Sequence, residues 1–264
     1  MACVDVERQG ASGIIRFTNP PMGVINTPQS EEMLTVFRAL SSDPTVQTII
    51  FTGGQPGIFI RHWDVSEYIA LMDAAEAGLP PPDLGGTPNQ AIMALIDEVP
   101  NAPQPVIAAI NGMCMGAGFE LALACDLRIA DPKAQSIGAV ECRVGAHPAA
   151  GAVSRLPRIV GEAAALNIVL RGLIFSGQEA YDIGLVTELA DDPIARALEI
   201  AGVWETRVGV GLANAKRLIR SALDRPVAAG LIDERRSHDE IVQQSAELRQ
   251  NLRRVLPPGD IRDL

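Results

Sequence analysis

Lysine, and positive charge in general, is scarce in this sequence. The 264 residues include 22 basic and 32 acidic side chains, for a net charge of −10, and the lysines are Lys133 and Lys216. Nucleic-acid binding depends on clustered lysine and arginine, and attachment to an anionic membrane surface needs a polybasic segment. We therefore expect that neither a nucleic acid nor a membrane is a partner of this protein.

Long hydrophobic runs are also missing. A membrane-spanning helix needs about 18 consecutive apolar residues, and the sequence has no such run. The most apolar segment, residues 105–130, is interrupted by Asn111, Glu120, Asp126 and Arg128. Charged residues begin at Asp5, before any apolar run that could form a signal peptide. These patterns predict a cytoplasmic protein.

Cysteine and histidine are few and scattered. The four cysteines are Cys3, Cys114, Cys125 and Cys142, and none of them forms a C-x-x-C pair. The three histidines stand far apart, at positions 62, 147 and 238. A disulfide framework or a metal site would need these residues in clusters. We therefore expect reduced cysteines and no metal.

Several catalytic motifs are absent as well. The sequence has no G-x-x-x-x-G-K-[ST], no G-x-S-x-G and no H-E-x-x-H, which argues against a P-loop, an α/β-hydrolase and a zinc protease. Gly116-Ala117-Gly118 supplies a G-x-G, but Leu121 stands where a dinucleotide-binding loop has its third glycine.

What the chain does contain is a series of short strands and helices. Strands are expected at 4–7, 13–17, 46–51, 105–110, 127–130 and 136–139. Helices are expected from Thr27, as N-cap, to Leu40, and at 90–99, 119–124, 161–171, 177–183, 193–206, 211–223 and 231–255. Residues 68–90 predict a short helix followed by a long loop or lid. Strands separated by helices indicate an α/β core, here residues 1–192, and residues 193–264 form a helical segment.

The segment 105–156 carries the clearest chemical signal. Small residues at 116–118 begin a helix, so its first backbone amides are uncovered and could hold an anionic oxygen. Close packing of the helix on a strand would favour the same small residues.

Two glutamates in this segment are candidate acid–base groups. Glu120 lies in the first turn of the helix, where it could instead simply complement the helix dipole. Glu141 lies in a mostly apolar loop, where it could instead pair with Arg143. Two carboxylates beside an oxyanion site would suit proton transfer next to a carbonyl, but the spacing does not establish that they meet.

The same segment resembles the signature of the crotonase superfamily, which is typified by enoyl-CoA hydratase. The resemblance rests on Met115–Ala130, Val140–Gly145 with Pro148–Gly151 and Arg155-Leu156-Pro157, and on the downstream Gly177–Ala180 and Ile183–Val186. It covers nearly the whole chain. It implies a β/α spiral core with a C-terminal helical oligomerisation segment, assembled as a homotrimer or homohexamer.

The resemblance also implies an active site. Backbone amides of Trp63 and Ala117 would form an oxyanion hole for a thioester carbonyl, Glu141 would exchange a proton at C2, and Glu120 would hold the water. The implied reaction is hydration of a 2-enoyl-CoA, or the reverse dehydration, with coenzyme A as part of the substrate and no bound cofactor. Isomerisation or carbon–carbon hydrolysis on the same scaffold, and a non-catalytic CoA-thioester-binding oligomer, are the alternatives.

The chain departs from the family pattern at Arg61-His62-Trp63, where small residues and glycine are usual. His62 could be a second titrating group or could pack beside Trp63. Residues expected in the substrate pocket are His62, Met115, Gly116 and His147, and those expected to contact CoA are Arg61 and Asp64.

Overall fold

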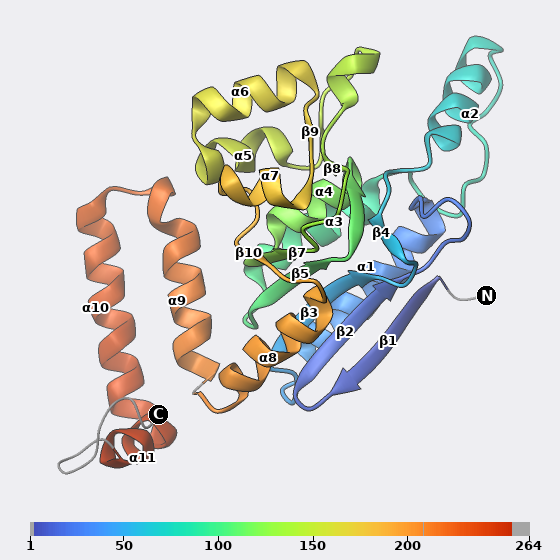
Figure 1. Ribbon diagram of the computed structural model, residues 1–264. Helices are drawn as coiled ribbons and strands as arrows, with labels where there is room; N and C mark the ends of the chain where they lie inside the picture. The colour runs from blue at the N-terminus through green and yellow to red at the C-terminus, as the bar shows by residue number, and fades with distance from the viewer. Residues whose placement is uncertain (1–2, 208, 255–264) are drawn as a thin grey trace.

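The computed structural model describes residues 3–207 and 209–254 and contains two sheets (Figure 1). The larger sheet has the strand order β1-β2-β3-β5-β7-β10. Its strands are β1 (Val4–Gln9), β2 (Ser12–Phe17), β3 (Thr48–Gly53), β5 (Val106–Ile110), β7 (Leu127–Ala130) and β10 (Glu188–Leu189). β1 and β2 form the predicted antiparallel hairpin, and each of the remaining pairs is parallel. The predicted mixed α/β fold with parallel strands is confirmed.

The smaller sheet has the order β4-β6-β8-β9. Its strands are β4 (Gly57–Ile60), β6 (Gly112–Met115), β8 (Ile137–Gly138) and β9 (Ile174–Phe175). After β3, β5 and β7 the chain crosses from the larger sheet to the smaller one. The first two crossings each lead to one strand, and the third leads to β8 and then β9 before the chain returns to the larger sheet at β10. β4, β6, β9 and β10 were not predicted from the sequence.

Close backbone approach at the crossings explains two glycines. A Cβ atom on Gly53 would lie 1.7 Å from the carbonyl oxygen of Ile58, and one on Gly112 would lie 1.9 Å from the carbonyl carbon of Gly57. Asn111 joins the first two crossings, because its side chain accepts from the Gly53 amide and donates to the carbonyls of Gly53 and Gln55, each at 3.1 Å. The two sheets are therefore fixed to one another at these crossings.

Helices cover both faces of the larger sheet. The core-forming helices are α1 (Thr27–Ser42), α3 (Gln90–Glu98) and α4 (Ala117–Ala124). α8 (Pro193–Glu205) packs through Ala197, Ile194 and Leu198 on the opposite face, against a cluster that includes Ile50 and Ile107. The first helix after the boundary predicted between 192 and 193 therefore packs on the core sheet. The boundary itself stays a prediction.

The helix predicted with Thr27 as its N-cap begins one residue earlier than expected, at Thr27 itself. Asn26 is the N-cap: its side chain accepts from the Gln29 amide at 3.2 Å, and the Gln29 side chain accepts from the Asn26 amide at 3.1 Å. The prediction of Thr27 as cap was wrong because this asparagine–glutamine pair satisfies the first amides better than the threonine hydroxyl.

The segment predicted as a short helix and loop forms an arm that projects from the core (Figure 1). Its helix, α2 (Val65–Glu76), starts earlier than expected because Asp64 caps it, and residues 77–89 lead back to α3. The remaining helices of the core are α5 (Ala152–Val160), α6 (Glu162–Arg171) and α7 (Gly177–Asp182), with short 3-10 turns at Val99–Asn101 and Glu141–Val144. α5 was not predicted.

The chain ends in helices that extend from the core (Figure 1). They are α9 (Gly209–Ser221), α10 (Val227–Gln244) and α11 (Ala246–Arg254), with a 3-10 turn at Ala222–Asp224. The single helix predicted at 231–255 was wrong, because the chain leaves helical geometry at Ser245, and its expected last residue lies outside the described residues. Within the described ranges no helix has the length and apolar character to cross a membrane.

Candidate active site

The N-terminus of α4 lies at the junction of the two sheets. β6 ends at Met115, and Gly116 takes a positive φ of 51° that turns the chain into the helix. The first helical hydrogen bond joins the Glu120 amide to the Gly116 carbonyl at 2.9 Å. The Ala117 amide precedes this bond, and within the described part of the chain it has no acceptor. The start of α4 therefore has a free amide donor.

A second free amide lies on the neighbouring segment, at Trp63. Ile25 forms a parallel bridge to Trp63, with bonds from the Ile25 amide to the His62 carbonyl at 2.9 Å and from the Asp64 amide to the Ile25 carbonyl at 2.7 Å. In this geometry the N–H of Trp63 itself points away from Ile25. A Cβ on Gly116 would lie 3.4 Å from the Cβ of His62, so the two segments are adjacent.

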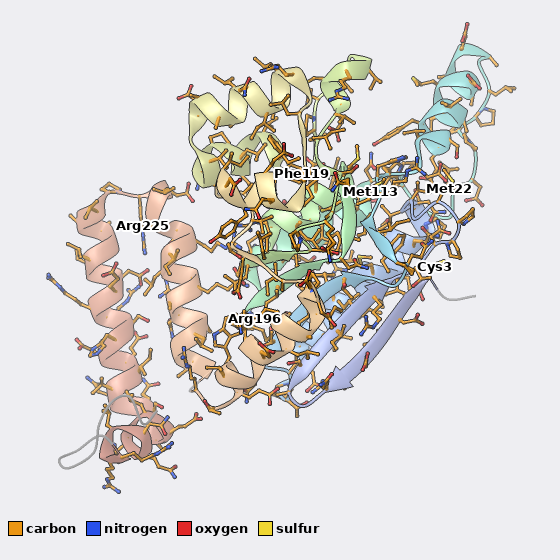
Figure 2. All side chains as sticks on the ribbon, viewed as in Figure 1. Cys3, Met22, Met113, Phe119, Arg196 and Arg225 are labelled. Atoms are coloured by element: carbon orange, nitrogen blue, oxygen red, sulfur yellow. The ribbon has the colours of Figure 1, made fainter. Side chains whose placement is uncertain are left out.

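Glycine is required where α4 meets this segment. A Cβ on Gly118 would lie 2.5 Å from the carbonyl oxygen of Ile60. The packing explanation for the small residues therefore holds at Gly118, while the Ala117 amide stays unpaired. Phe119, which follows, points into the molecule's interior from α4 (Figure 2) and is 1% exposed.

Glu120 is a buried carboxylate held by two amides. Its side chain is 4% exposed, and its Oε1 accepts from the amides of Ala150 at 2.8 Å and Ala152 at 3.1 Å. Burial raises the pKa of Glu120 to about 7, because the loss of water outweighs the two amide bonds; the charge of Glu141 raises the pKa further, and that of Arg155 lowers it.

Glu141 faces the same region. It begins the 3-10 turn after β8, and its buried Oε2 has no hydrogen-bond partner in the described structure. A Cβ on Gly116 would lie 3.3 Å from its Oε1. Burial is the main cause that raises the pKa of Glu141; backbone hydrogen bonds at Glu141 and Val140, and to a smaller extent the nearby His62, act against it. Among the described residues no ion pair joins Glu141 to Arg143, whose side chain packs over Gly172.

The other predicted site residues divide into two groups. His62 lies against Gly116, with its Nδ1 within hydrogen-bonding distance of the Trp63 carbonyl oxygen, and the half-buried Met115 directly precedes Gly116. His147, by contrast, is exposed, and its Nδ1 lies 3.0 Å from the Pro148 carbonyl oxygen. The structure thus brings His62 and Gly116 to Glu141.

The two residues predicted to contact CoA already have protein partners. Asp64 accepts from the amide of Ser66 at 3.0 Å and from its hydroxyl at 2.6 Å, as the N-cap of α2. Arg61 extends toward the sulfur of Met22, 3.8 Å from its Nη1. Met22 lies at the base of the α2 arm (Figure 2).

Sequence reasoning missed the groups that hold Glu120. These are the amides of Ala150 and Ala152, on either side of Gly151, which has a φ of 111°. A glycine directly before a helix was the available signal, but it does not reveal which distant carboxylate the amides reach. Cys114, Cys125 and Cys142 are free, the first two of them buried, and no cluster of metal-binding side chains occurs in residues 3–207 and 209–254.

This arrangement can be compared with known proteins. The sequence profile of the enoyl-CoA hydratase/isomerase family matches residues 7–254. The chain belongs to this family. The crotonase-superfamily resemblance seen in the motifs of this family member is thereby confirmed, and the profile spans both glutamates and both free amides.

Individual relatives agree with the family assignment. This family member is 33% identical over 216 residues to mitochondrial methylglutaconyl-CoA hydratase of Rattus norvegicus, with 80% of the chain and 65% of the rat protein covered. The human protein of the same name is 34% identical, with 73% of the chain and 56% of that protein covered. The chain thus spans less than two thirds of these mammalian relatives.

Solved structures share the fold over almost the full length. An enoyl-CoA hydratase from Bacillus anthracis superposes with a TM-score of 0.83 at 26% identity, covering 93% of both chains. A second, from Geobacillus kaustophilus, gives a TM-score of 0.84 at 25% identity and covers 97% of this chain and 96% of that one. The crotonase fold with a C-terminal helical region is therefore established for this chain.

Proposed function

We propose that this enzyme catalyses the hydration of a 2-enoyl-CoA thioester to the 3-hydroxyacyl-CoA, and the reverse dehydration. The observation that supports the proposal is the proximity of the buried Glu120 and the half-buried Glu141 beside a helix start with a free amide. Each carboxyl has a raised pKa, and the charge of Glu141 contributes to raising the pKa of Glu120. Such a pair favours retaining a proton near neutral pH, which suits a reaction that needs one acid and one base.

The proposed reaction uses these groups in the following way. The thioester carbonyl oxygen accepts hydrogen bonds from the amides of Trp63 and Ala117, which stabilise the enolate formed on it. Glu120, in its ionised form, takes a proton from water as the water oxygen bonds to C3. Glu141, in its protonated form, gives its proton to C2 as the enolate collapses. The product gains one water, Glu120 then releases its proton to solvent, and Glu141 takes up a proton from solvent, which restores both groups.

The pocket carries the chain's own departures from the family pattern. His62 and Trp63 stand where small residues are usual in the family. His62 lies against Gly116, and Trp63 carries the second free amide. We assign the acyl pocket to them together with Met115, and the outer part of the CoA chain to Arg61. His147 and Asp64 have no separate support for a substrate contact. No cofactor beyond the CoA of the substrate is proposed, and the assembly proposed is a homotrimer or homohexamer in the cytoplasm.

A second candidate is isomerisation of the double bond within the acyl chain. One observation favours it: Oε2 of Glu141 is free, whereas Oε1 of Glu120 already accepts two amide bonds. A single base at Glu141 that removes one proton and returns it to another carbon would then be sufficient.

The absorbance of the conjugated enoyl thioester separates these reactions. Wild type should remove it from a panel of 2-enoyl-CoA substrates and yield a product heavier by one water. Glu120→Gln and Glu141→Gln should each lower kcat by about 100-fold or more while both still bind the thioester. Loss in Glu141→Gln alone, with a product of unchanged mass, would favour isomerisation. Binding without turnover by the wild type across the panel would refute both and favour a non-catalytic CoA-thioester-binding protein.

A further inference from the structure

The loop that holds Glu120 is itself held in place by one side chain. Residues 148–151 lead into α5, and the amides of Ala150 and Ala152 both donate to the Glu120 carboxylate. The carbonyl of Ala150 accepts from Nη1 of Arg155 at 3.2 Å. A shift of this loop would therefore move both donors and, with them, the carboxylate.

Arg155 connects this loop to the end of α3. Its Nη2 donates to the Ile96 carbonyl at 3.1 Å and lies 3.6 Å from Oδ1 of Asp97. The side chain is 19% exposed, so most of the guanidinium is removed from water. The planar guanidinium reaches these two carbonyls through two different nitrogens, whereas a lysine would have to reach both from a single nitrogen.

The same arginine packs against Gly151. A Cβ at this position would lie 1.8 Å from Nη1 of Arg155, and the φ of 111° already disfavours any other residue. The guanidinium thus lies directly on the glycine between the two donor amides. This contact is independent of the hydrogen bonds and places the positive charge of Arg155 next to the Glu120 site.

We propose that Arg155 is a positioning residue that fixes the Ala150–Ala152 amides on Glu120 and keeps this carboxylate ready to act. Its role in turnover rests on the proposed hydration, whereas its effect on Glu120 can be measured without it. Arg155 does not touch the site of the reacting atoms; it acts through the loop and through its charge.

The charges around the two groups fix the direction of the effect. Glu120 faces Glu141 from the 3-10 turn after β8 and Arg155 from α5. Arg155 also faces Asp97 on α3 and Arg220 on α9. Because the nearby arginine favours the ionised form of Glu120, its removal should raise the pKa of that carboxyl.

The test compares Arg155→Gln and Arg155→Lys with Arg158→Gln. Arg158 lies one turn further along α5 and pairs with Asp224 at an exposed position, so it is the matched control. The carboxyl carbon of Glu120 is titrated by NMR in protein labelled with ¹³C-glutamate, with Glu120→Gln used for assignment. Unfolding temperature, kcat and KM are measured on the same samples.

Arg155→Gln should raise the pKa of Glu120 and lower kcat by about 10- to 100-fold with KM within about twofold, because a displaced catalytic group slows the reaction more than binding. Arg155→Lys should keep the Glu120 pKa nearer to wild type, because its charge remains, while kcat stays low because the two-carbonyl fork is lost. Arg158→Gln should match wild type in both readouts.

A folded Arg155→Gln variant with a wild-type Glu120 titration and wild-type kcat would overturn the proposal. So would a variant that lost thermal stability alone. If Arg155→Gln does not fold, Arg155→Lys decides through its kcat. If the wild type has no hydratase activity, the proposed function fails but the titration still decides the role of Arg155.

Discussion

At the scale of single residues, burial of Glu120 destabilises its ionised form. Its carboxylate is 4% exposed, and two amide bonds do not fully replace the water it loses, so its pKa rises to about 7. The folded protein therefore binds this proton more tightly than the unfolded chain does. The stabilising effect of the proton is fully present below the ordinary pKa of 4.5 and is lost as the pH rises toward 7.

This sign gives a first prediction for Glu120→Gln. The variant has no carboxyl to ionise, so its stability relative to wild type should increase between pH 5 and pH 8, by up to about 3 kcal/mol. Urea unfolding at the two pH values measures the difference. In Glu98→Gln the difference should stay nearly constant over this range, because the hydrogen bond from Arg38 lowers the pKa of Glu98 and its contribution is therefore lost only below the ordinary pKa of 4.5. An equal Glu120→Gln difference at both pH values would contradict the burial argument.

The free amide of Ala117 gives a second prediction. Ala117 is the first residue of α4, a position where proline is well tolerated, and proline removes the amide proton. Ala117→Pro should therefore fold and lose about 100- to 1,000-fold in kcat. Ala117→Gly keeps the amide and should retain activity within about tenfold. Circular dichroism confirms folding, and a fully active, folded proline variant would refute the oxyanion assignment.

At the scale of elements, the site depends on how closely α4 approaches the end of β4. Gly118 contacts the backbone of Ile60, three residues before Trp63, so one close approach sets the relation between the two free amides. Backbone atoms at such a contact cannot move aside as a flexible side chain would.

Gly118→Ala should therefore damage both stability and activity. The added methyl group, 2.5 Å from the Ile60 carbonyl oxygen, should cost about 1–3 kcal/mol of unfolding free energy. It should also lower kcat by about tenfold or more through displacement of the amides. Gly202→Ala on α8 is the control, because a Cβ there meets nothing within 4 Å and should stabilise by about 0.5–1 kcal/mol. Equal urea midpoints for the two variants would contradict the contact argument.

Elements with a clear period or cap were predictable from the sequence, and short ones were not. The hairpin of β1 and β2, the helix α3 and the strands β5 and β7 were found because they combine a regular apolar pattern with turn residues at their ends. β4 and β6 begin at Gly57 and Gly112, and their few residues give no period. Gly112 reflects close contact with the backbone of Gly57, and Gly57 has a φ of 72°; a local pattern contains neither.

The site could be predicted in part for a related reason. Motifs in the sequence marked Glu120, Glu141 and the helix start at Gly116, and the structure brings these three together. The contacts that support the site join residues far apart in the sequence. The Ala150 amide and Glu120 are 30 residues apart, and Arg155 and Ile96 are 59 residues apart. Such contacts depend on how distant elements pack, and one sequence holds no record of that packing.

At the scale of the whole molecule, the extended C-terminal helices are tied to the core by buried charge. Lys216 on α9 lies 2.8 Å from Asp126 and donates to the carbonyls of Val99 and Gln104. Arg220 contacts the same aspartate at 2.7 Å. Asp126 also accepts from the Val106 amide, so one carboxylate connects α9 with β5 of the larger sheet.

Loss of this charge should loosen α9. Asp126→Asn keeps the shape of the side chain but leaves Lys216, which is 7% exposed, without its counter-charge, at a cost of about 3 kcal/mol. Amides of α9 should then exchange with deuterium sooner than those of α4. Asp191→Asn removes the partner of the exposed Lys133 and should change stability by less than about 0.5 kcal/mol. Equal exchange rates in the two variants would contradict this attachment.

The burial of Lys216 also limits the covalent chemistry open to the protein. Thioesters transfer their acyl groups to unprotonated, accessible amines. Of the two lysines, Lys216 is enclosed by carbonyls and Asp126, whereas Lys133 is 80% exposed. Its ion pair with Asp191 raises the pKa of Lys133, which reduces the unprotonated fraction. A protein proposed to work among acyl donors therefore offers them one accessible lysine, and that lysine is a weak nucleophile.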